Sequence, residues 1–287
     1  MLVGIGLVIL LVMVFGGFAL TGGNVMVILE AIPHELIVIG GAALGSLVIG
    51  NSMPGLKALA RGVIKAAKGP TYHREDYLQA IFLTAKLMKI LRTEGPVALE
   101  SHVEEPAQSE LFKAYPKLLA DHFFVALVTD TLRLVLISSG NLNLRAVEEV
   151  VDNAIRNHHR QALRPAQLLQ SLGDAFPALG IVAAVLGVVK TMASIDKPPA
   201  ILGGMIGSAL VGTFMGVLIA YGIVSPLAHR LKHVIEEDAE LYRAVKQIIL
   251  ASLAKHPQPL VIEAARTGIS AANQPSFAEV FQGLQAR

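Results

Sequence analysis

Four long apolar stretches dominate the pattern of hydrophobic and polar positions along the chain. The longest, Pro198–Ala228, has no charged side chain in 31 residues, and Met1–Leu20 is also uncharged. Leu36–Gly50 and the residues between Asp174 and Lys190 form two shorter runs. Because about 20 apolar residues cross the hydrocarbon core of a bilayer, the pattern predicts four membrane-spanning helices in two hairpins.

The two shorter runs reach spanning length with help from their flanks. The second does so when Ala31–Glu35 lies in the headgroup region, and the third when Lys190 extends its ammonium group to the interface so that the helix can continue. The acidic residues nearest the bilayer are then all expected at the ends of spans: Glu30, Glu35 and Asp174.

Outside these runs, apolar residues recur at the three- and four-residue spacing of amphipathic helices. The helix-stop signal Gly95-Pro96 follows the first such segment, Asn143 is the expected N-cap of the third, and this third helix is expected to end before Pro165, ahead of the third span. The expected helices are Asp76–Arg92, Phe123–Ser138, Asn143–Gln161 and Leu227–Ala254.

The predicted fold is an all-α membrane protein with four transmembrane helices, a helical domain between the second and third, and a helical C-terminal tail. Its segments are a hairpin at 1–50, a helical domain at 51–170, a second hairpin at 171–227 and a tail at 228–287. In membrane proteins, basic residues concentrate on the cytoplasmic flanks of the spans. In this chain basic residues follow the second and fourth spans and are missing from the connection at 21–32. This pattern predicts that both termini and the helical domain are cytoplasmic.

Composition narrows the functional classes. The hydrophobic fraction is 53% and the mean hydropathy is +0.58, far from a typical soluble domain. The absence of cysteine excludes disulfides and thiol catalysis. A net charge of +2 gives no sign of a nucleic-acid partner. His158-His159 lacks a third ligand at metal-site spacing and is expected at a solvated helix end. With no catalytic motif either, we expect neither an enzyme nor a cofactor.

Small residues repeat every fourth position in the fourth span, which places them on one helix face. Such a face allows close packing between membrane helices, where lipid gives little hydrophobic drive for association. The residues of this small-residue stripe are Gly204, Ser208, Gly212, Gly216 and Ala220.

Two prolines lie in the second hairpin, Pro177 in the third span and Pro226 in the fourth. A proline inside a helix removes a hydrogen bond and bends or breaks the helix. They are therefore candidate hinges, although pattern alone favours a first-turn proline at Pro177 and a helix end at Pro226.

The predicted spans contain hydroxyl groups but no central acid, base or charged group. Thr213 and Tyr221 are among these hydroxyls, and Thr213 either bonds its own backbone four residues earlier or faces an ion path. Intramembrane ionisable residues usually carry function. Either this chain moves no ions, or a partner supplies the carboxylate.

Several motifs resemble the family of bacterial flagellar stator A subunits (MotA, in the MotA/TolQ/ExbB superfamily), and the likeness runs from end to end. Phe176–Val189 and Val211–Leu227 are similar to the third and fourth spans of that family, Glu110–Asp121 to its cytoplasmic segment and Gln274–Glu279 to its tail.

The resemblance implies a subunit that converts proton-motive force into torque in the bacterial inner membrane. It implies a ring of five copies around a dimer of the single-span partner MotB, whose membrane aspartate carries the ion. Coupling would involve Pro177, Pro226, Thr213 and Tyr221. Ala184 stands where sodium-driven relatives have a threonine, so the resemblance favours protons.

Charged side chains cluster around Gly95-Pro96, and such a stretch is most often only a solvated surface. The resemblance implies instead that Arg92 and Glu100 engage the rotor protein FliG. Two alternatives remain open: an ExbB- or TolQ-type energiser of outer-membrane processes, which typically has three spans, and a membrane scaffold that conducts nothing.

Overall fold

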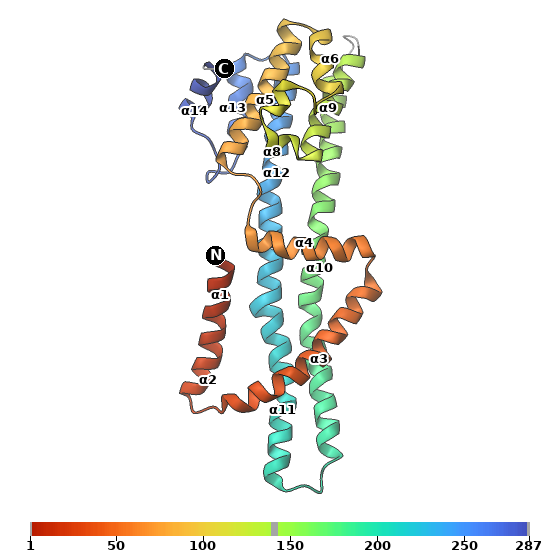
Figure 1. Cartoon of the computed structure of the whole chain (residues 1–287), viewed down its shortest axis with the longest axis vertical. Helices are drawn as coiled ribbons and strands as arrows, with labels where there is room; N and C mark the ends of the chain where they lie inside the picture. Colours follow the sequence, from red (N-terminus) through yellow and green to blue (C-terminus); the bar gives the residue numbers. More distant parts are fainter. Residues whose placement is uncertain (1, 139–142, 286–287) are drawn as a thin grey trace. The chain divides into compact units, whose positions relative to one another are not determined.

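The computed structural model describes residues 2–138 and 143–285, and every regular element in them is helical (Figure 1). Among the described residues, four helices are long and apolar enough to cross a membrane: Leu2–Leu20, Val25–Gly50, Leu144–Met192 and Pro199–Leu253. The prediction of four spans in an all-α fold is confirmed, because each apolar run coincides with one of these helices over its described residues.

The chain divides into two compact units, each made of two separate stretches of sequence. The first comprises 1–69 and 163–233, and the second comprises 70–162 and 234–287. The first contains the four apolar runs and the two ends of the predicted helical domain, and the second contains the rest of that domain and most of the tail. The four segment boundaries given above concern the membrane borders and stay a prediction.

The first unit opens with a helix that buries little of itself. It consists of α1 (Leu2–Leu11), the π-helical segment η1 (Val12–Gly16) and α2 (Gly17–Leu20), and none of their residues is buried. The ring of Phe15 meets Phe214 edge to face with centroids 6.1 Å apart. An apolar helix with so few internal contacts leaves most of its surface for lipid or for other proteins.

Helix α3 (Val25–Gly50) crosses α11 (Pro199–Val217) within the same unit (Figure 1). The Asn24 side chain accepts a hydrogen bond from the backbone nitrogen of Met26 at 3.0 Å, so the helix begins well before the run that starts at Leu36. Ile39 is fully buried and belongs to the same apolar core as Val211 and Met215.

Helix α4 (Met53–Lys68) was not predicted, although its residues are amphipathic. Figure 1 shows it crossing α10 (Leu144–Met192) and α12 (Ser225–Leu253). Gly62 provides the close approach, because a methyl group there would lie 2.9 Å from side-chain carbons of both Pro165 and Leu231.

Helix α10 contradicts the expected break near Gln161. It runs unbroken over 49 residues, with Pro165 and Pro177 both in its interior. The Asn143 side chain accepts from the backbone nitrogens of Arg145 and Ala146, which confirms the predicted N-cap. Packing of a proline ring against neighbouring helices can outweigh the roughly 3 kcal/mol that an interior proline costs, as the Gly62 contact with Pro165 illustrates.

The same continuity overturns the prediction for the adjacent histidines. His158 and His159 lie half-buried inside α10, far from either end. The ring of His158 stacks on Phe123 with centroids 3.7 Å apart and meets Tyr242 edge to face. The prediction that these two histidines lie at a solvated helix end is therefore wrong.

The second unit is a helical domain with its own apolar core. Its largest fully buried side chains include Tyr77, Phe112 and Phe124. Its remaining helices are α5 (Arg74–Thr93), α6 (Pro96–Glu104), α7 (Glu110–Lys113), α8 (Pro116–Leu119), α9 (His122–Ile137), α13 (Gln258–Arg266) and α14 (Phe277–Gln285). The predicted helix stop at Gly95-Pro96 is confirmed, because Gly95 lies between α5 and α6 with φ +92°.

A polar cluster ties this domain together around Asp121. One carboxylate oxygen accepts from the backbone nitrogens of Phe123 and Phe124 and caps α9. The other accepts from the phenol groups of Tyr72 and Tyr242. Burial, reinforced by Asp121, raises the pKa of Tyr72 above its usual range, so its phenol stays a hydrogen-bond donor.

Candidate functional site

A row of glycines on α10 forms the contact between the third and fourth spans. Gly173, Gly180 and Gly187 are seven residues apart and so share one helix face. A methyl group on Gly180 would lie 2.8 Å from the carbonyl oxygen of Gly212, and one on Gly187 would lie 2.6 Å from the Ala209 methyl. We call these three residues the glycine row.

The small-residue stripe of the fourth span meets this row over only part of its length. Gly212, Gly216 and Ala220 are buried, Ser208 is half-buried and Gly204 is exposed. A methyl on Gly216 would lie 2.6 Å from the carbonyl oxygen of Phe176, whereas one on Gly204 would meet nothing within 4 Å. Backbone therefore packs directly on backbone at Gly216, and Gly180 closely approaches the carbonyl oxygen of Gly212.

Pro177 lies within the glycine row, and Pro226 follows the part of the fourth span that packs on it. Pro177 lies one turn after Gly173, and Pro226 follows Ser225, whose hydroxyl oxygen would be 2.9 Å from a methyl on Gly173. Pro226 is the second residue of α12 and directly follows the π-helical segment η2 (Leu218–Val224), so the helix continues through it. The alternatives of a first-turn proline and a helix end are therefore wrong.

A π-helical segment before a proline has a physical reason. The proline ring crowds the carbonyl group one turn earlier and cannot donate a hydrogen bond to it. Widening the preceding turn relieves that crowding, and such π segments are frequent at functional sites. The fourth span thus carries a local irregularity beside its contact with α10.

The other residues assigned to the pathway differ in exposure. Thr213 and Ala184 are half-buried, directly after Gly212 and Ala183, whereas Tyr221 is exposed. Among the described residues, the Thr213 hydroxyl makes no hydrogen bond to its own backbone, unlike Thr191, which bonds the Gly187 carbonyl at 2.9 Å. Their part in ion passage stays a prediction.

Glu35 is an acidic residue whose surroundings the sequence did not reveal. It lies ten residues after α3 begins and fifteen before it ends, so it is inside the helix, and its place relative to the membrane border stays a prediction. Its residue surface is only 9% exposed, and its Oε2 atom has no hydrogen-bond partner among the described residues. The cap at Asn24 is the signal that could have placed Glu35 inside the helix.

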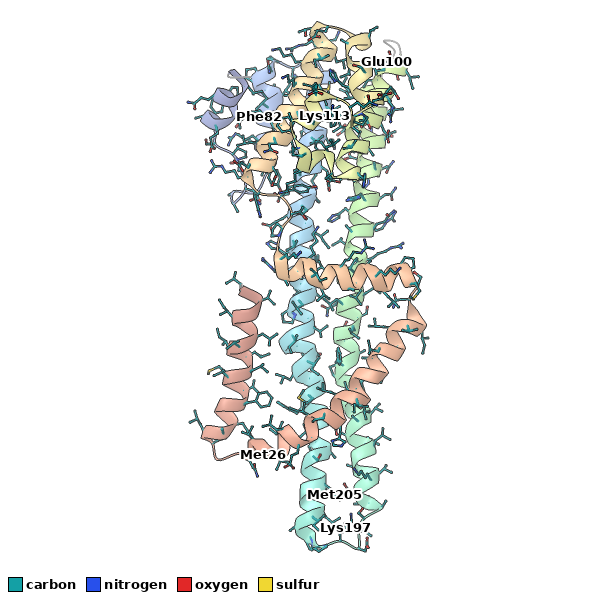
Figure 2. All side chains as sticks on the ribbon, in the orientation of Figure 1. Met26, Phe82, Glu100, Lys113, Lys197 and Met205 are labelled. Atoms are coloured by element: carbon teal, nitrogen blue, oxygen red, sulfur yellow. The ribbon has the colours of Figure 1, made fainter. Side chains whose placement is uncertain are left out.

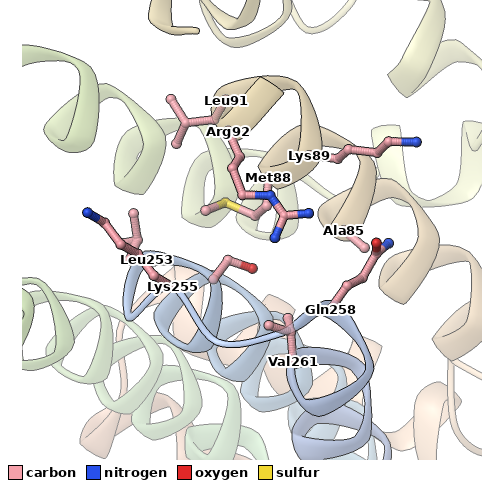
Figure 3. Close-up of a pocket in the computed structure, with 10 residues that line it drawn as sticks. Ala85, Met88, Lys89, Leu91, Arg92, Leu253, Lys255, Gln258 and Val261 are labelled. Atoms are coloured by element: carbon pink, nitrogen blue, oxygen red, sulfur yellow. The ribbon is translucent and has the colours of Figure 1, made fainter. Parts of the chain in front are cut away.

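The charged pair expected at the rotor lies on the second unit. Arg92, in the last turn of α5, lines a pocket of about 190 Å³ that α12 and α13 close from the other side. Figure 3 shows its guanidinium extending into this pocket, with Lys89 and Lys255 nearby. Lys89 and Lys255 also line the pocket, but Figure 3 shows their ammonium groups extending away from the guanidinium.

Glu100 lies on α6, labelled in Figure 2, and its side chain is exposed while Leu99 beside it is fully buried. Within the described part of the chain, neither Arg92 nor Glu100 forms an ion pair, whereas the nearby Glu104 pairs with Arg133 at 3.0 Å. Both charges are thus available to another protein.

No group of three metal-binding side chains occurs among the described residues. The fold and site therefore define a class: an all-α, multi-pass membrane protein with a closely packed third and fourth span and a separate helical domain.

Comparison with known proteins narrows this class. The family model for the motility protein A N-terminal region matches residues 4–95, and the model for the MotA/TolQ/ExbB proton channel family matches 117–244. Motility protein A of Salmonella typhimurium is 37% identical over 286 residues, covering 100% of this chain and 96% of the relative. Chemotaxis protein LafT of Vibrio parahaemolyticus is 34% identical and covers 98% and 97%.

Solved structures agree on the fold. The C. jejuni MotAB structure superposes with a TM-score of 0.73 at 19% identity, covering 96% of this chain and 98% of the other. The flagellar MotAB stator complex of Bacillus subtilis gives 0.68 at 20% identity, covering 90% and 91%. Because it is 37% identical to a motility protein A over its whole length, this chain belongs to the motility protein A family. This confirms the resemblance seen in the sequence.

Proposed function

We propose that this chain is a torque-generating subunit of the flagellar stator, which uses ion flow across the membrane to drive the rotor. The observation that carries the proposal is the full-length similarity to motility protein A, together with the closely packed third and fourth spans. The role is mechanical and involves no chemistry on a substrate.

The proposed complex contains a single-span partner of the MotB type, present as a dimer, and a ring of five copies of this chain. Two structural relatives are MotAB complexes. The first helix of this chain buries none of its residues within the chain, so apolar surface remains for such contacts. The partner's membrane aspartate binds the transported ion.

The proposed ion is the proton. The matching family model describes proton channels, and Ala184 offers no hydroxyl oxygen to a sodium ion, which prefers oxygen ligands. The basic flank after the second span favours cytoplasmic termini in the bacterial inner membrane. Swimming that needs sodium and survives a protonophore would contradict proton coupling.

The helical domain is proposed to engage FliG through Arg92 and Glu100. Each is exposed and, among the described residues, without an ion-pair partner. Exposed ion pairs contribute only about 0–1 kcal/mol each, so single reversals are expected to weaken docking in part. Arg92→Glu or Glu100→Lys should reduce swimming without changing proton conductance, and an equal loss of conductance would place these residues in gating or folding.

The central experiment restores the chain and its cognate single-span partner to a cell without stators. We expect the cells to swim again. We also expect proton entry to acidify the cytoplasm when the chain and its partner are co-expressed as a complex that conducts. A scaffold would conduct nothing, and an ExbB- or TolQ-type energiser would conduct but leave the cells immotile.

A further inference from the structure

The carboxyl group of Glu35 is buried where three helices of the first unit meet. A methyl group on Gly212 of α11 would lie 2.6 Å from Glu35 Oε2 and 3.2 Å from the methyl of Ala183 on α10. The absence of a side chain at Gly212 therefore makes the space that this carboxyl group fills. Gly212 belongs to the small-residue stripe, so the stripe does more than bring helices together.

No opposite charge accounts for a buried carboxylate at this position. Helix α11 contains no titratable residue, and the charged residues of α10 nearest in sequence to Ala183 are Asp174 and Lys190. The Asp174 carboxylate is engaged by Gln170 at 2.8 Å. The other titratable residues of α3 are His34, which is adjacent in sequence, and Glu30, and both are exposed.

An ionised carboxylate is costly in such a setting, both inside a membrane helix and without a hydrogen-bond donor. The neutral acid avoids most of that cost. The carboxyl group can therefore hold a proton while the helices are closed and release it when their separation admits water or a polar group. Only an O–H bond breaks and forms in this exchange.

Residues assigned to the pathway are the next in sequence after two of those that surround the Glu35 carboxyl group. Thr213 follows Gly212 on α11, and Ala184 follows Ala183 on α10. We propose that Glu35 is a proton-binding site of this chain within the ion pathway, at the junction of α3, α10 and α11. This inference rests on the proposed stator function, and it adds a titrating group from this chain to the one that the partner supplies.

The test uses the complete complex in lipid vesicles and the variants Glu35→Gln, Glu35→Asp and Glu30→Gln. Glu30 is the matched control, because it is the same acid on the same helix but is exposed. We expect Glu35→Gln to lower voltage-driven proton flux at least tenfold, Glu35→Asp to keep most of it, and Glu30→Gln to match the wild type.

A second readout does not depend on transport. The infrared C=O stretching band of protonated carboxylic acids is expected in the wild-type complex and in Glu30→Gln. In Glu35→Gln the part of this band that comes from Glu35 should disappear. Labelling by a hydrophobic carbodiimide should likewise map to the peptide that contains Glu35 and weaken as the pH is raised.

The outcomes separate the two proposals. Normal flux in an assembled Glu35→Gln complex, or an unchanged infrared band, overturns the proton site and leaves the stator function intact. A wild-type complex that neither conducts nor drives swimming overturns the stator function, while the infrared band still reports on Glu35. If Glu35→Gln fails to assemble, Glu35→Asp and the wild-type labelling decide, and no labelling at Glu35 contradicts the proposal.

Discussion

Adding one methyl group at Gly216 should separate the third and fourth spans. In Gly216→Ala the new carbon would lie 2.6 Å from the Phe176 carbonyl oxygen and 2.9 Å from the Cα of Gly180. Ordinary van der Waals contact begins near 3.4 Å, so the first distance is about 0.8 Å too short. Both obstacles are backbone atoms, and no side-chain rotation can relieve the overlap.

The helices must therefore move apart locally by several tenths of an ångström. A gap of about 0.5–1 Å forfeits a quarter to a half of the attraction between packed atoms, and overpacking typically costs about 1–3 kcal/mol. Since about 1.4 kcal/mol corresponds to a tenfold change in an equilibrium constant, Gly216→Ala should weaken the hairpin by roughly 5- to 150-fold.

The control is Gly204→Ala on the same stripe, where the methyl would meet nothing within 4 Å. Thermal unfolding of the purified protein in detergent, paired with swimming in soft agar, measures both variants. We expect Gly216→Ala to lower both the melting temperature of the purified protein and the swimming of the cells. Gly204→Ala is expected to leave the melting temperature and swimming unchanged. Equal stability of Gly216→Ala and wild type would refute the close backbone contact.

Three further predictions concern other parts of the chain. Asp121→Ala removes the α9 cap and a shared acceptor for two phenol groups, so the melting temperature should fall by an amount equivalent to roughly 2–5 kcal/mol; an unchanged value would contradict the cluster. Pro177→Leu and Pro226→Leu should abolish torque while the membrane content of the complex, followed by immunoblot, stays normal; normal swimming in both would remove their coupling role. Hydrogen bonds from the Ser276 hydroxyl and backbone hold the pKa of Glu279 below its usual value, so α14 should be stabilised above the usual carboxyl pKa and released as the pH falls through the lowered one. Hydrogen exchange of α14 amides measures this release, which Glu279→Gln should make independent of pH.

Much of the architecture was predictable because it depends on local properties of the sequence. Transfer of apolar side chains into lipid depends on composition and length, which is why the four runs marked the four spans. Backbone preferences are equally local, and they placed the cap at Asn143 and the stop at Gly95.

The tertiary structure decided which faces meet. The spacing of Gly173, Gly180 and Gly187 is visible in the sequence, but only the packed helices show that this row meets Gly212 and Gly216. Pro165 stays inside α10 although local preference favours a break there. Contact between segments distant in sequence has no local signature, because it depends on the shape of both surfaces.

Glu35 shows the difference most clearly. By itself the sequence determined that an acid follows Pro33 at the edge of an apolar run, and exposure to headgroups was the favoured reading. Only the fold supplied Gly212 as the space for its carboxyl group. A buried acid is tolerated where protein rather than lipid surrounds it, and that surrounding exists only once three distant segments have packed together.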